Sequence, residues 1–324
     1  MIATVTLNTA MDRALVVPNF QAGRRHRASE GVTLPGGHGV TIARALRRLG
    51  TPVVATGFVG GLTGSNIVER LTDEGILNDF VRISEPSRTS TAVLDPISGV
   101  FTEINERGPR VQPAETALLL EKLRYLVRAS RAVVMAGSVP RDMDDDVYQR
   151  IVRMVRGEGV PTVVSQPDDA DVLRAALAGE PTMTVVEQRE AESLVGHEFS
   201  GDDDYLLALD EMARMGGQSV LIMHEAGTHA RLKAGRTVSY YAVTHDPVEA
   251  VSPLGSTDVF VAGYLHGYLA DRPPVERLTY GIGASLANMR ALGAGVFEKG
   301  DAVRLQREVE VRVLEAVREE ELAD

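Results

Sequence analysis

The sequence predicts an α/β protein in which helices cover a mostly parallel sheet. Short apolar or β-branched runs recur along the chain, and each is followed by turn residues and then by a helix-like pattern. This alternation is typical of parallel strands joined by helical crossovers. The length of 324 residues suits one large domain. We therefore expect a single domain spanning residues 1–324.

Each element of this fold has its own pattern in the sequence. The clearest strand candidates are 53–59, 132–135, 162–165, 182–186 and 219–223. Helical patterns lie at 40–49, 66–74, 114–126, 146–156 and 204–215. Two further stretches, about 14–33 and 89–104, alternate without an intervening helix, which predicts the strands of a small lid.

The composition excludes several classes of protein. The chain contains no cysteine, so it has no disulfide, thiolate metal site or cysteine nucleophile. With 34 basic and 45 acidic residues the net charge is −11, which disfavours general binding to nucleic acid or an anionic membrane. No apolar run reaches the length of a bilayer span, and no secretory signal is apparent. We expect a cytoplasmic protein without a nucleic-acid or membrane partner.

The strongest local signal is Gly255-Ser256-Thr257-Asp258, directly before an apolar helical run. A glycine turn that opens a helix presents free backbone N–H groups, and the helix dipole adds positive charge there, which favours a phosphate. A carboxylate beside that phosphate can accept a proton from an attacking hydroxyl. The same residues are equally consistent with Asp258 serving only as a helix cap.

Two other glycine-rich turns lie between a predicted strand and a predicted helix. They read PGGHG at 35–39 and GFVGGLTG at 57–64. Paired glycines let a ligand approach the backbone closely, although each turn is also compatible with a plain tight turn. Neither has the spacing of a P-loop or of a dinucleotide fingerprint, which disfavours a nicotinamide oxidoreductase.

Together these segments resemble the PfkB family of carbohydrate kinases, in particular its branch of 1-phosphofructokinases and tagatose-6-phosphate kinases. The similarity covers almost the whole chain. It begins with TVTLNTAMD at 4–12, includes both glycine-rich turns, continues through TEIN at 102–105, GP at 108–109 and AGSVP at 136–140, and ends at the turn before Asp258. Several motifs in this order are far more specific than any one of them.

The resemblance implies a three-layer, ribokinase-like fold with a β-lid, and transfer of the γ-phosphoryl group of ATP, with Mg²⁺, to a sugar hydroxyl. Asp258 would be the general base, and Gly255, Ser256 and Thr257 would form the anion hole. The implied substrate-binding residues are Asp12, Gly36, Gly37, His38, Thr41, Arg88, Ser90, Glu103 and Ser138. The implied nucleotide-binding residues are Glu187, Glu190, His224, Glu225 and Gly227, with Glu190 also as metal ligand.

The sugar side departs from the family pattern at three positions. His38 stands where the family has a lysine, and Thr41 and Ser90 stand where it has asparagines. A neutral histidine lacks the fixed positive charge of a lysine. Arg88 is retained, and its planar guanidinium suits a substrate phosphate, although a plain surface arginine would look the same in sequence.

The nucleotide side departs more strongly. Ser256 and Thr257 replace an alanine and a glycine, and a β-branched Thr257 would be strained if its φ had to be positive. Glu187 replaces a neutral asparagine, and its added negative charge beside a triphosphate is unfavourable unless a metal ion screens it.

We predict a kinase that acts on a ketose phosphate, such as fructose-1-phosphate, fructose-6-phosphate or tagatose-6-phosphate, or on a related sugar. The alternative is a catalytically weak relative that binds sugar or nucleotide as a sensor or regulatory partner, because most substitutions lie in the nucleotide half. Exposed edges of the lid strands predict a homodimer formed through the lid.

Overall fold

The computed structural model describes residues 1–318, and eleven strands of that range form one sheet in the order β15-β14-β13-β12-β11-β10-β9-β1-β4-β5, with β6 paired to β4. The strands are β1 (Ile2–Thr6), β4 (Val53–Gly60), β5 (Leu77–Asn78), β6 (Val81–Ile83), β9 (Ala132–Ala136), β10 (Thr162–Ser165), β11 (Met183–Glu187), β12 (Ser219–His224), β13 (Gly227–Ala234), β14 (Thr237–Thr244) and β15 (Glu310–Arg318). From β12 to β5 the strands are parallel, and from β12 to β15 they are antiparallel.

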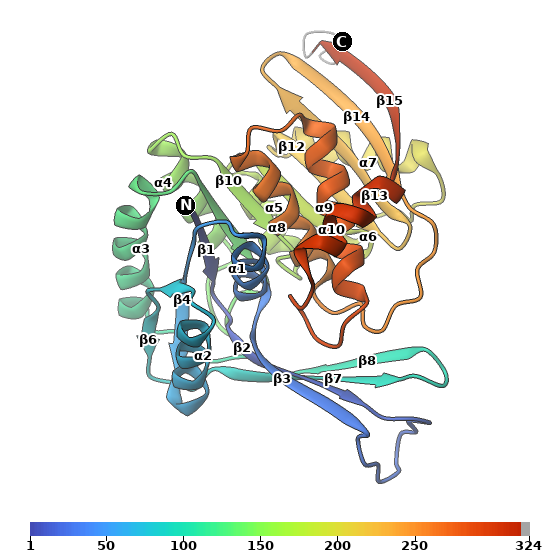
Figure 1. Cartoon of the computed structure of the whole chain (residues 1–324). Coiled ribbons are helices and arrows are strands. Elements are labelled where there is room, and N and C mark those ends of the chain that lie inside the picture. Colours follow the sequence, from blue (N-terminus) through green and yellow to red (C-terminus); the bar gives the residue numbers. More distant parts are fainter. Residues whose placement is uncertain (319–324) are drawn as a thin grey trace.

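Helices cover both faces of this sheet, so the fold is the three-layer α/β architecture that the family resemblance implies (Figure 1). One face carries α1 (His38–Leu49), α2 (Gly61–Asp73), α8 (Ser256–Leu269), α9 (Pro274–Met289) and α10 (Lys299–Leu305). The other carries α3 (Pro113–Arg128), α4 (Val147–Gly157), α5 (Ala170–Leu177), α6 (Gln188–Val195) and α7 (Asp202–Arg214). Successive strand residues feed opposite cores: Val53 and Ala55 pack on the first side and Val54 on the second.

A second sheet of four strands projects from the main body, at the bottom of Figure 1. Its order is β3-β2-β7-β8, with β2 (Ala10–Val16), β3 (Glu30–Gly36), β7 (Arg88–Asp95) and β8 (Val100–Asn105). The strands begin at residues 10 and 88, earlier than in the ranges 14–33 and 89–104 read from the sequence. The central pair β2 and β7 is parallel, so segments that are far apart in the chain form one surface.

The predicted strands and helices of the main domain agree with the structure to within a few residues, except that α2 begins five residues earlier than the pattern at 66–74 indicates. The structure differs most from the sequence prediction after β12, because 219–223 was the last strand that the sequence indicated. The chain instead forms a tight hairpin, because His224 pairs with Gly227 and the antiparallel strands β13 and β14 extend the sheet. No helix among residues 1–318 has both the length and the apolar character needed to cross a membrane.

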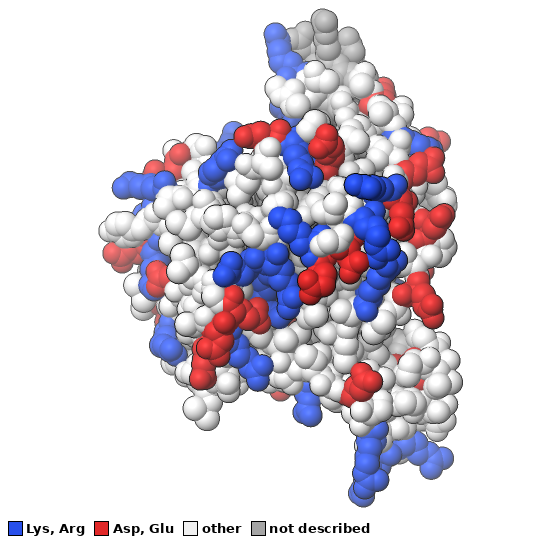
Figure 2. Space-filling model, viewed as in Figure 1, with Lys and Arg blue, Asp and Glu red and all other residues white. Residues whose placement is uncertain are grey.

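Charges of both signs are interspersed over the face shown in Figure 2. The tip of the second sheet differs, because the connection between β2 and β3 carries Arg24, Arg25 and Arg27, all exposed. The net charge of −11 therefore coexists with a local positive segment on the projecting sheet.

Candidate active site

A pocket lies where the carboxyl edge of the main sheet faces the second sheet. Its walls come from all four strands of the second sheet, the starts of α1 and α8, the segment after β10 and the segment after α9. The carboxyl ends of parallel strands meet at one edge of a sheet, which is where α/β proteins usually bind ligands.

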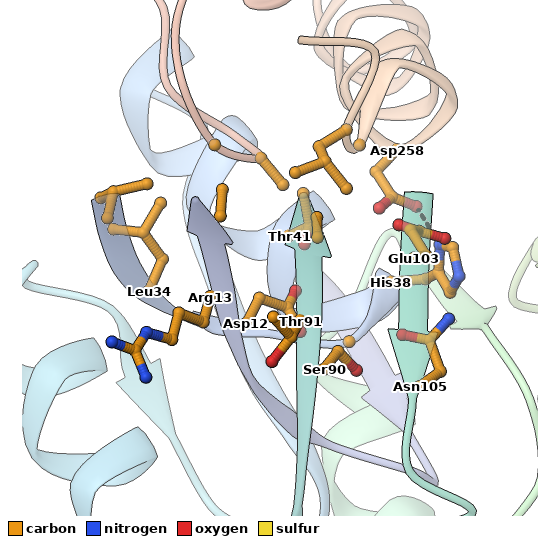
Figure 3. A pocket seen from close by; sticks show the side chains of 18 of the residues that line it. Asp12, Arg13, Leu34, His38, Thr41, Ser90, Thr91, Glu103, Asn105 and Asp258 are labelled. Atoms are coloured by element: carbon orange, nitrogen blue, oxygen red, sulfur yellow. Dashed lines mark hydrogen bonds and ion pairs between the residues drawn. The ribbon is translucent and has the colours of Figure 1, made fainter. Parts of the chain in front are cut away.

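The second sheet supplies two rows of side chains that face the pocket (Figure 3). Strand pairing aligns Leu34, Asp12, Ser90 and Asn105 in one row, and Val32, Ala14, Ala92 and Glu103 in the next. Alternate residues of a strand share a face, so both rows lie on the same side of the sheet. Predicted sugar-side residues from three separate segments are thereby brought together.

Asp12 is held by Gly36, the last residue of β3, and by Gly37, the residue after it. A Cβ atom on Gly36 would lie 1.8 Å from Asp12 Oδ2, so only glycine leaves room for this carboxylate. The backbone N–H of Gly37 donates a hydrogen bond to Asp12. Burial raises the pKa of Asp12 to about 6, against the opposing charge of Arg88 and His38. Gly37 lines the pocket, and Gly36 acts by making space for Asp12.

Arg88 lines the pocket at the start of β7. Its Nε donates to the carbonyl oxygen of Asn8 at 3.4 Å, and its Nη1 donates to that of Glu106 at 3.3 Å. Asn8 Nδ2 in turn donates to Ser138 Oγ at 3.1 Å. The predicted substrate residue Ser138 is therefore joined to Arg88 through Asn8 and is not itself among the residues that line the pocket.

The start of α8 enters the pocket from the opposite side. Gly255 adopts a left-handed conformation with φ 69°, and a Cβ there would lie 2.7 Å from Ala294 Cβ. Thr257 lies inside the helix and is free of the positive φ that would strain it. Ser256 N–H donates to Pro253 O at 3.2 Å, whereas the N–H groups of Thr257 and Asp258 have no hydrogen-bond partner within the described residues. Two donors therefore remain available beside the Asp258 carboxylate.

His38 contacts Asp258 directly. Its Nδ1 lies 3.0 Å from Asp258 Oδ1, the contact dashed in Figure 3. Burial raises the pKa of Asp258, and the charge and hydrogen bond of His38 oppose that rise. Burial by itself would lower the pKa of His38, but Asp258, with smaller effects of Asp168 and Glu190, raises it to about 10. The Thr41 methyl group lies nearby, packed against the start of α8 at Gly255.

The predicted nucleotide residues Glu187 and Glu190 lie next to the start of α8, outside the pocket lining. Glu187 Oε1 accepts hydrogen bonds from Thr257 Oγ1 at 3.1 Å and from Gln166 Nε2 at 2.9 Å. Glu187 and Glu190 also form the capping box of α6, and Glu190 Oε1 accepts from the N–H of Asp168 at 3.2 Å. Burial raises the pKa of Glu190 to about 7.

His224, Glu225 and Gly227 occupy the β12–β13 hairpin. His224 Nε2 lies 3.1 Å from His229 Nδ1, and burial lowers the pKa of His224 to about 4. Gly227 has φ 144°, and a Cβ there would lie 1.9 Å from Val243 O. The close pairing with β14 thus explains why residue 227 is a glycine, and no bound ligand is needed to explain it.

Comparison with known proteins decides the family. Residues 3–298 match the family described as pfkB family carbohydrate kinase. The chain belongs to that family. It is a carbohydrate kinase, a phosphotransferase with an alcohol group as acceptor, as the motifs predict.

Solved structures agree with this assignment. The kinase is 26% identical to a protein of Thermotoga maritima described as a possible 1-phosphofructokinase, with TM-score 0.87, covering 97% of this chain and 100% of that one. Phosphofructokinase-2 of Escherichia coli, solved in a tetrameric inhibited form, is 23% identical with TM-score 0.83, covering 94% of this chain and 98% of that one. The second likeness shows the common ribokinase-like fold.

Several pocket residues of the kinase were missed by the sequence analysis. Asn105 is in register with Ser90, and the motif TEIN contained it. Asp168 lines the pocket just after β10, and a polar residue behind a buried strand was a usable signal. The segment at Gly293 and Ala294 had no sequence signal of this kind. Fully buried Asn288 anchors it, since Asn288 Oδ1 accepts from the N–H groups of residues 295 and 296.

The oxygen donors beside α8 suit Mg²⁺ bound together with a nucleotide. Within residues 1–318 no three His, Cys, Asp or Glu side chains converge as a metal-binding group. Mg²⁺ in kinases usually takes one or two carboxylates and completes its shell with phosphate oxygens and water. Glu187 and Glu190 provide such carboxylates, and Glu187 is hydrogen-bonded to the helix start that carries the free N–H groups. The residues present therefore fit the ion.

Proposed function

We propose that this kinase transfers the γ-phosphoryl group of ATP to a hydroxyl group of a ketose phosphate, with Asp258 as the general base. The observation that carries the proposal is the start of α8. There a buried carboxylate lines the pocket next to two N–H groups that have no partner within the described residues. In-line phosphoryl transfer requires a base for the attacking hydroxyl group and, next to it, N–H donors that bind the transferred phosphoryl group.

The opposite wall supports the choice of a phosphorylated sugar. Asp12 offers an acceptor for sugar hydroxyl groups, and Arg88 offers a cation for a substrate phosphate. The two residues lie on the neighbouring strands β2 and β7, where Asp12 pairs with Ser90 and Arg88 pairs with Ala10. Phosphofructokinase-2 of Escherichia coli, which shares the fold, has been solved with fructose-6-phosphate. A ketose phosphate is therefore the substrate class that we propose.

On the donor side, Glu187 and Glu190 would hold Mg²⁺ together with the nucleotide phosphates. The ion would neutralise charge on the phosphates when bound. The free N–H groups of Thr257 and Asp258 would stabilise the charge that develops on the transferred group.

The decisive test is ADP release with fructose-1-phosphate, fructose-6-phosphate, tagatose-6-phosphate and the free sugars, for the parent and for Asp258→Asn. The amide cannot take the proton, so we expect kcat to fall by about 10²–10⁴-fold with an unchanged melting curve. Ser193→Ala, at an exposed position of α6, serves as a control for effects of substitution near the nucleotide residues. Equal kcat in the parent and in Asp258→Asn would contradict the assigned base.

The location of Glu187 favours one alternative outcome. Its carboxylate lies across the start of α8, where it repels an approaching triphosphate unless a metal ion screens it. Absence of ADP release with every sugar, together with sugar-dependent thermal stabilisation of the parent, would indicate a relative that binds sugar as a sensor.

We also propose that two copies associate through the second sheet. Its edge strands are β3 and β8, and edge strands with apolar side chains favour pairing or burial. Val100 and Ile104 of β8 are 55% and 61% exposed, and strand alternation puts them on the face opposite to the pocket. The adjacent turn exposes Ile97 at 68%.

A further inference from the structure

His38 is the first residue of α1 and Asp258 is the third residue of α8, and these two helices pack against each other. The two residues are 220 positions apart in the chain, and their side chains meet at 3.0 Å. Asp258 is 3% exposed, so its carboxylate has little access to water. A contact of this kind is made inside the site, beside the atoms that would react.

The imidazole ring is held from behind by a rigid backbone. A Cβ on Gly137 would lie 2.9 Å from His38 Cδ2, so the glycine backbone packs against the ring. The N–H of Gly137 donates to Ser165 O at 3.0 Å, and fully buried Tyr148 donates its hydroxyl to Gly137 O at 2.6 Å. The ring therefore has a fixed support on the side away from Asp258.

The surroundings of His38 are strongly acidic. The pKa of His38 is raised by Asp258 on α8, Asp168 after β10 and Glu190 on α6. The charge of His38 in turn lowers the pKa of Glu103 on β8 and of Asp12 on β2. The charge of Arg88 opposes the rise in the pKa of one of them, Asp12. Carboxylates on this many sides favour the positively charged form of the imidazole.

We propose that His38 is a positioning residue whose imidazolium keeps Asp258 ionised and directed into the pocket. The inference rests on the proposed function, because it assigns a partner to the proposed base. Nδ1 of His38 is engaged by Asp258 Oδ1, which leaves Oδ2 of Asp258 to receive the proton of the sugar hydroxyl. In that step the sugar O–H bond breaks and the Oδ2–H bond forms, while the sugar oxygen bonds to the γ-phosphorus and the bond to the ADP oxygen breaks.

This role differs from the substrate contact that the sequence suggested for His38. A lysine at this position carries its charge at every physiological pH, whereas a histidine carries it only while its acidic neighbours hold the proton. Loss of Asp258 should therefore discharge His38, and loss of His38 should make Asp258 easier to protonate.

The charge on His38 can be measured without turnover. We would record ¹⁵N spectra of the histidine rings at pH 7.5 for the parent, for Asp258→Asn and for His38→Asn. The signal that is missing from the His38→Asn spectrum is the signal of His38. We expect a charged imidazolium in the parent and a neutral ring in Asp258→Asn. A neutral His38 ring in the parent would overturn the proposal.

The pH profile of kcat/KM tests the effect on the base. In His38→Ala and His38→Asn we expect kcat to fall at least about tenfold, and the acid limb to move up by about 1–3 pH units, because the cation beside Asp258 is lost. His38→Asn keeps a neutral donor near the place of Nδ1, so it should recover part of kcat while its acid limb stays shifted. His26→Asn in the connection between β2 and β3, where the ring contacts Gln21, should leave the acid limb unmoved.

The outcomes separate the possible roles of His38. An acid limb that stays in place while KM for the sugar rises would make His38 a substrate ligand and overturn the positioning role. An equal loss of kcat at every pH would indicate a purely structural role and would also overturn it. A charged His38 in a parent that phosphorylates none of the sugars would contradict the proposed function and not the ion pair.

Discussion

Two aspartates of the second sheet show how residue environment sets charge. Burial raises the pKa of Asp12 to about 6, even though Gly37 N–H and nearby cations favour the ionised form. Burial by itself would raise the pKa of Asp95 as well, but hydrogen bonds from Ser98 and from backbone N–H groups lower it. The ionised Asp12 side chain therefore lowers the stability of the fold, as is common for residues whose role is ligand binding.

We predict that Asp12→Asn stabilises the fold at pH 7.5 and raises KM for the sugar. The pKa of Asp12 is higher in the folded protein than the ordinary 3.8, so ionised Asp12 destabilises the fold above about pH 6. One pKa unit corresponds to about 1.4 kcal/mol, and partial exposure reduces the effect to on the order of 1–2 kcal/mol. The gain should shrink as pH falls through 6 and disappear below 3.8.

Urea unfolding at pH 7.5, 5 and 3.5 measures this dependence. Asp95→Asn is the matched control of opposite sign, because the lowered pKa of Asp95 means that its ionised form stabilises the fold and is lost on acidification. A loss of stability in Asp12→Asn at pH 7.5 would contradict the assigned environment.

At the scale of elements, the start of α8 depends on one left-handed residue. Gly255 turns the chain at φ 69°, and a Cβ added there would lie 2.7 Å from Ala294 Cβ and 3.1 Å from Thr41 Cγ2, so the turn that orients the N–H groups of Thr257 and Asp258 needs a glycine. The loop that carries Ala294 is fixed in turn by Asn288 and by Arg44, whose Nη1 donates to Ala294 O at 2.7 Å. The anion-binding geometry is thus a product of α1, α8 and the loop after α9 together.

We predict that Gly255→Ala lowers both stability and kcat. The left-handed backbone costs a non-glycine residue about 1–2 kcal/mol, and the added Cβ meets Ala294 at 2.7 Å, which costs more. Gly50→Ala, at the end of α1, is a matched control, since φ is 82° there and no atom lies within 4 Å of the new Cβ. We expect Gly50→Ala to show the backbone cost alone with normal ADP release. Equal losses in the two variants would show that packing at Gly255 is unimportant.

At the scale of the whole molecule, one face of the projecting sheet lines the pocket, and the other face exposes Val100 and Ile104 on the edge strand β8. We predict that the parent is a dimer by size-exclusion chromatography with light scattering, and that Val100→Lys with Ile104→Lys gives monomers of unchanged circular dichroism. Charges on that face would have to be buried without partners in the interface, which is strongly unfavourable. Tyr125→Lys on α3, where the tyrosine is 69% exposed, should leave the dimer intact. A parent with the mass of one chain would refute the association.

Much of the fold was predictable because its signals are local. Buried strands such as β10 and amphipathic helices such as α1 appear in sequence as short periodic patterns, whatever their neighbours are. The antiparallel extension β13–β15 was not identified, because nothing local in β15 shows that it pairs with a strand more than sixty residues earlier.

The sequence by itself determined the alternation of strands and helices, the glycine turn before Asp258 and the family motifs, because each is a pattern of neighbouring residues. Only the tertiary structure decided that His38 meets Asp258 and that Glu187 receives the hydroxyl of Thr257. It also decided that Asp12, Ser90 and Asn105 form one row. These contacts depend on helix packing and strand register, which join residues that are distant along the chain.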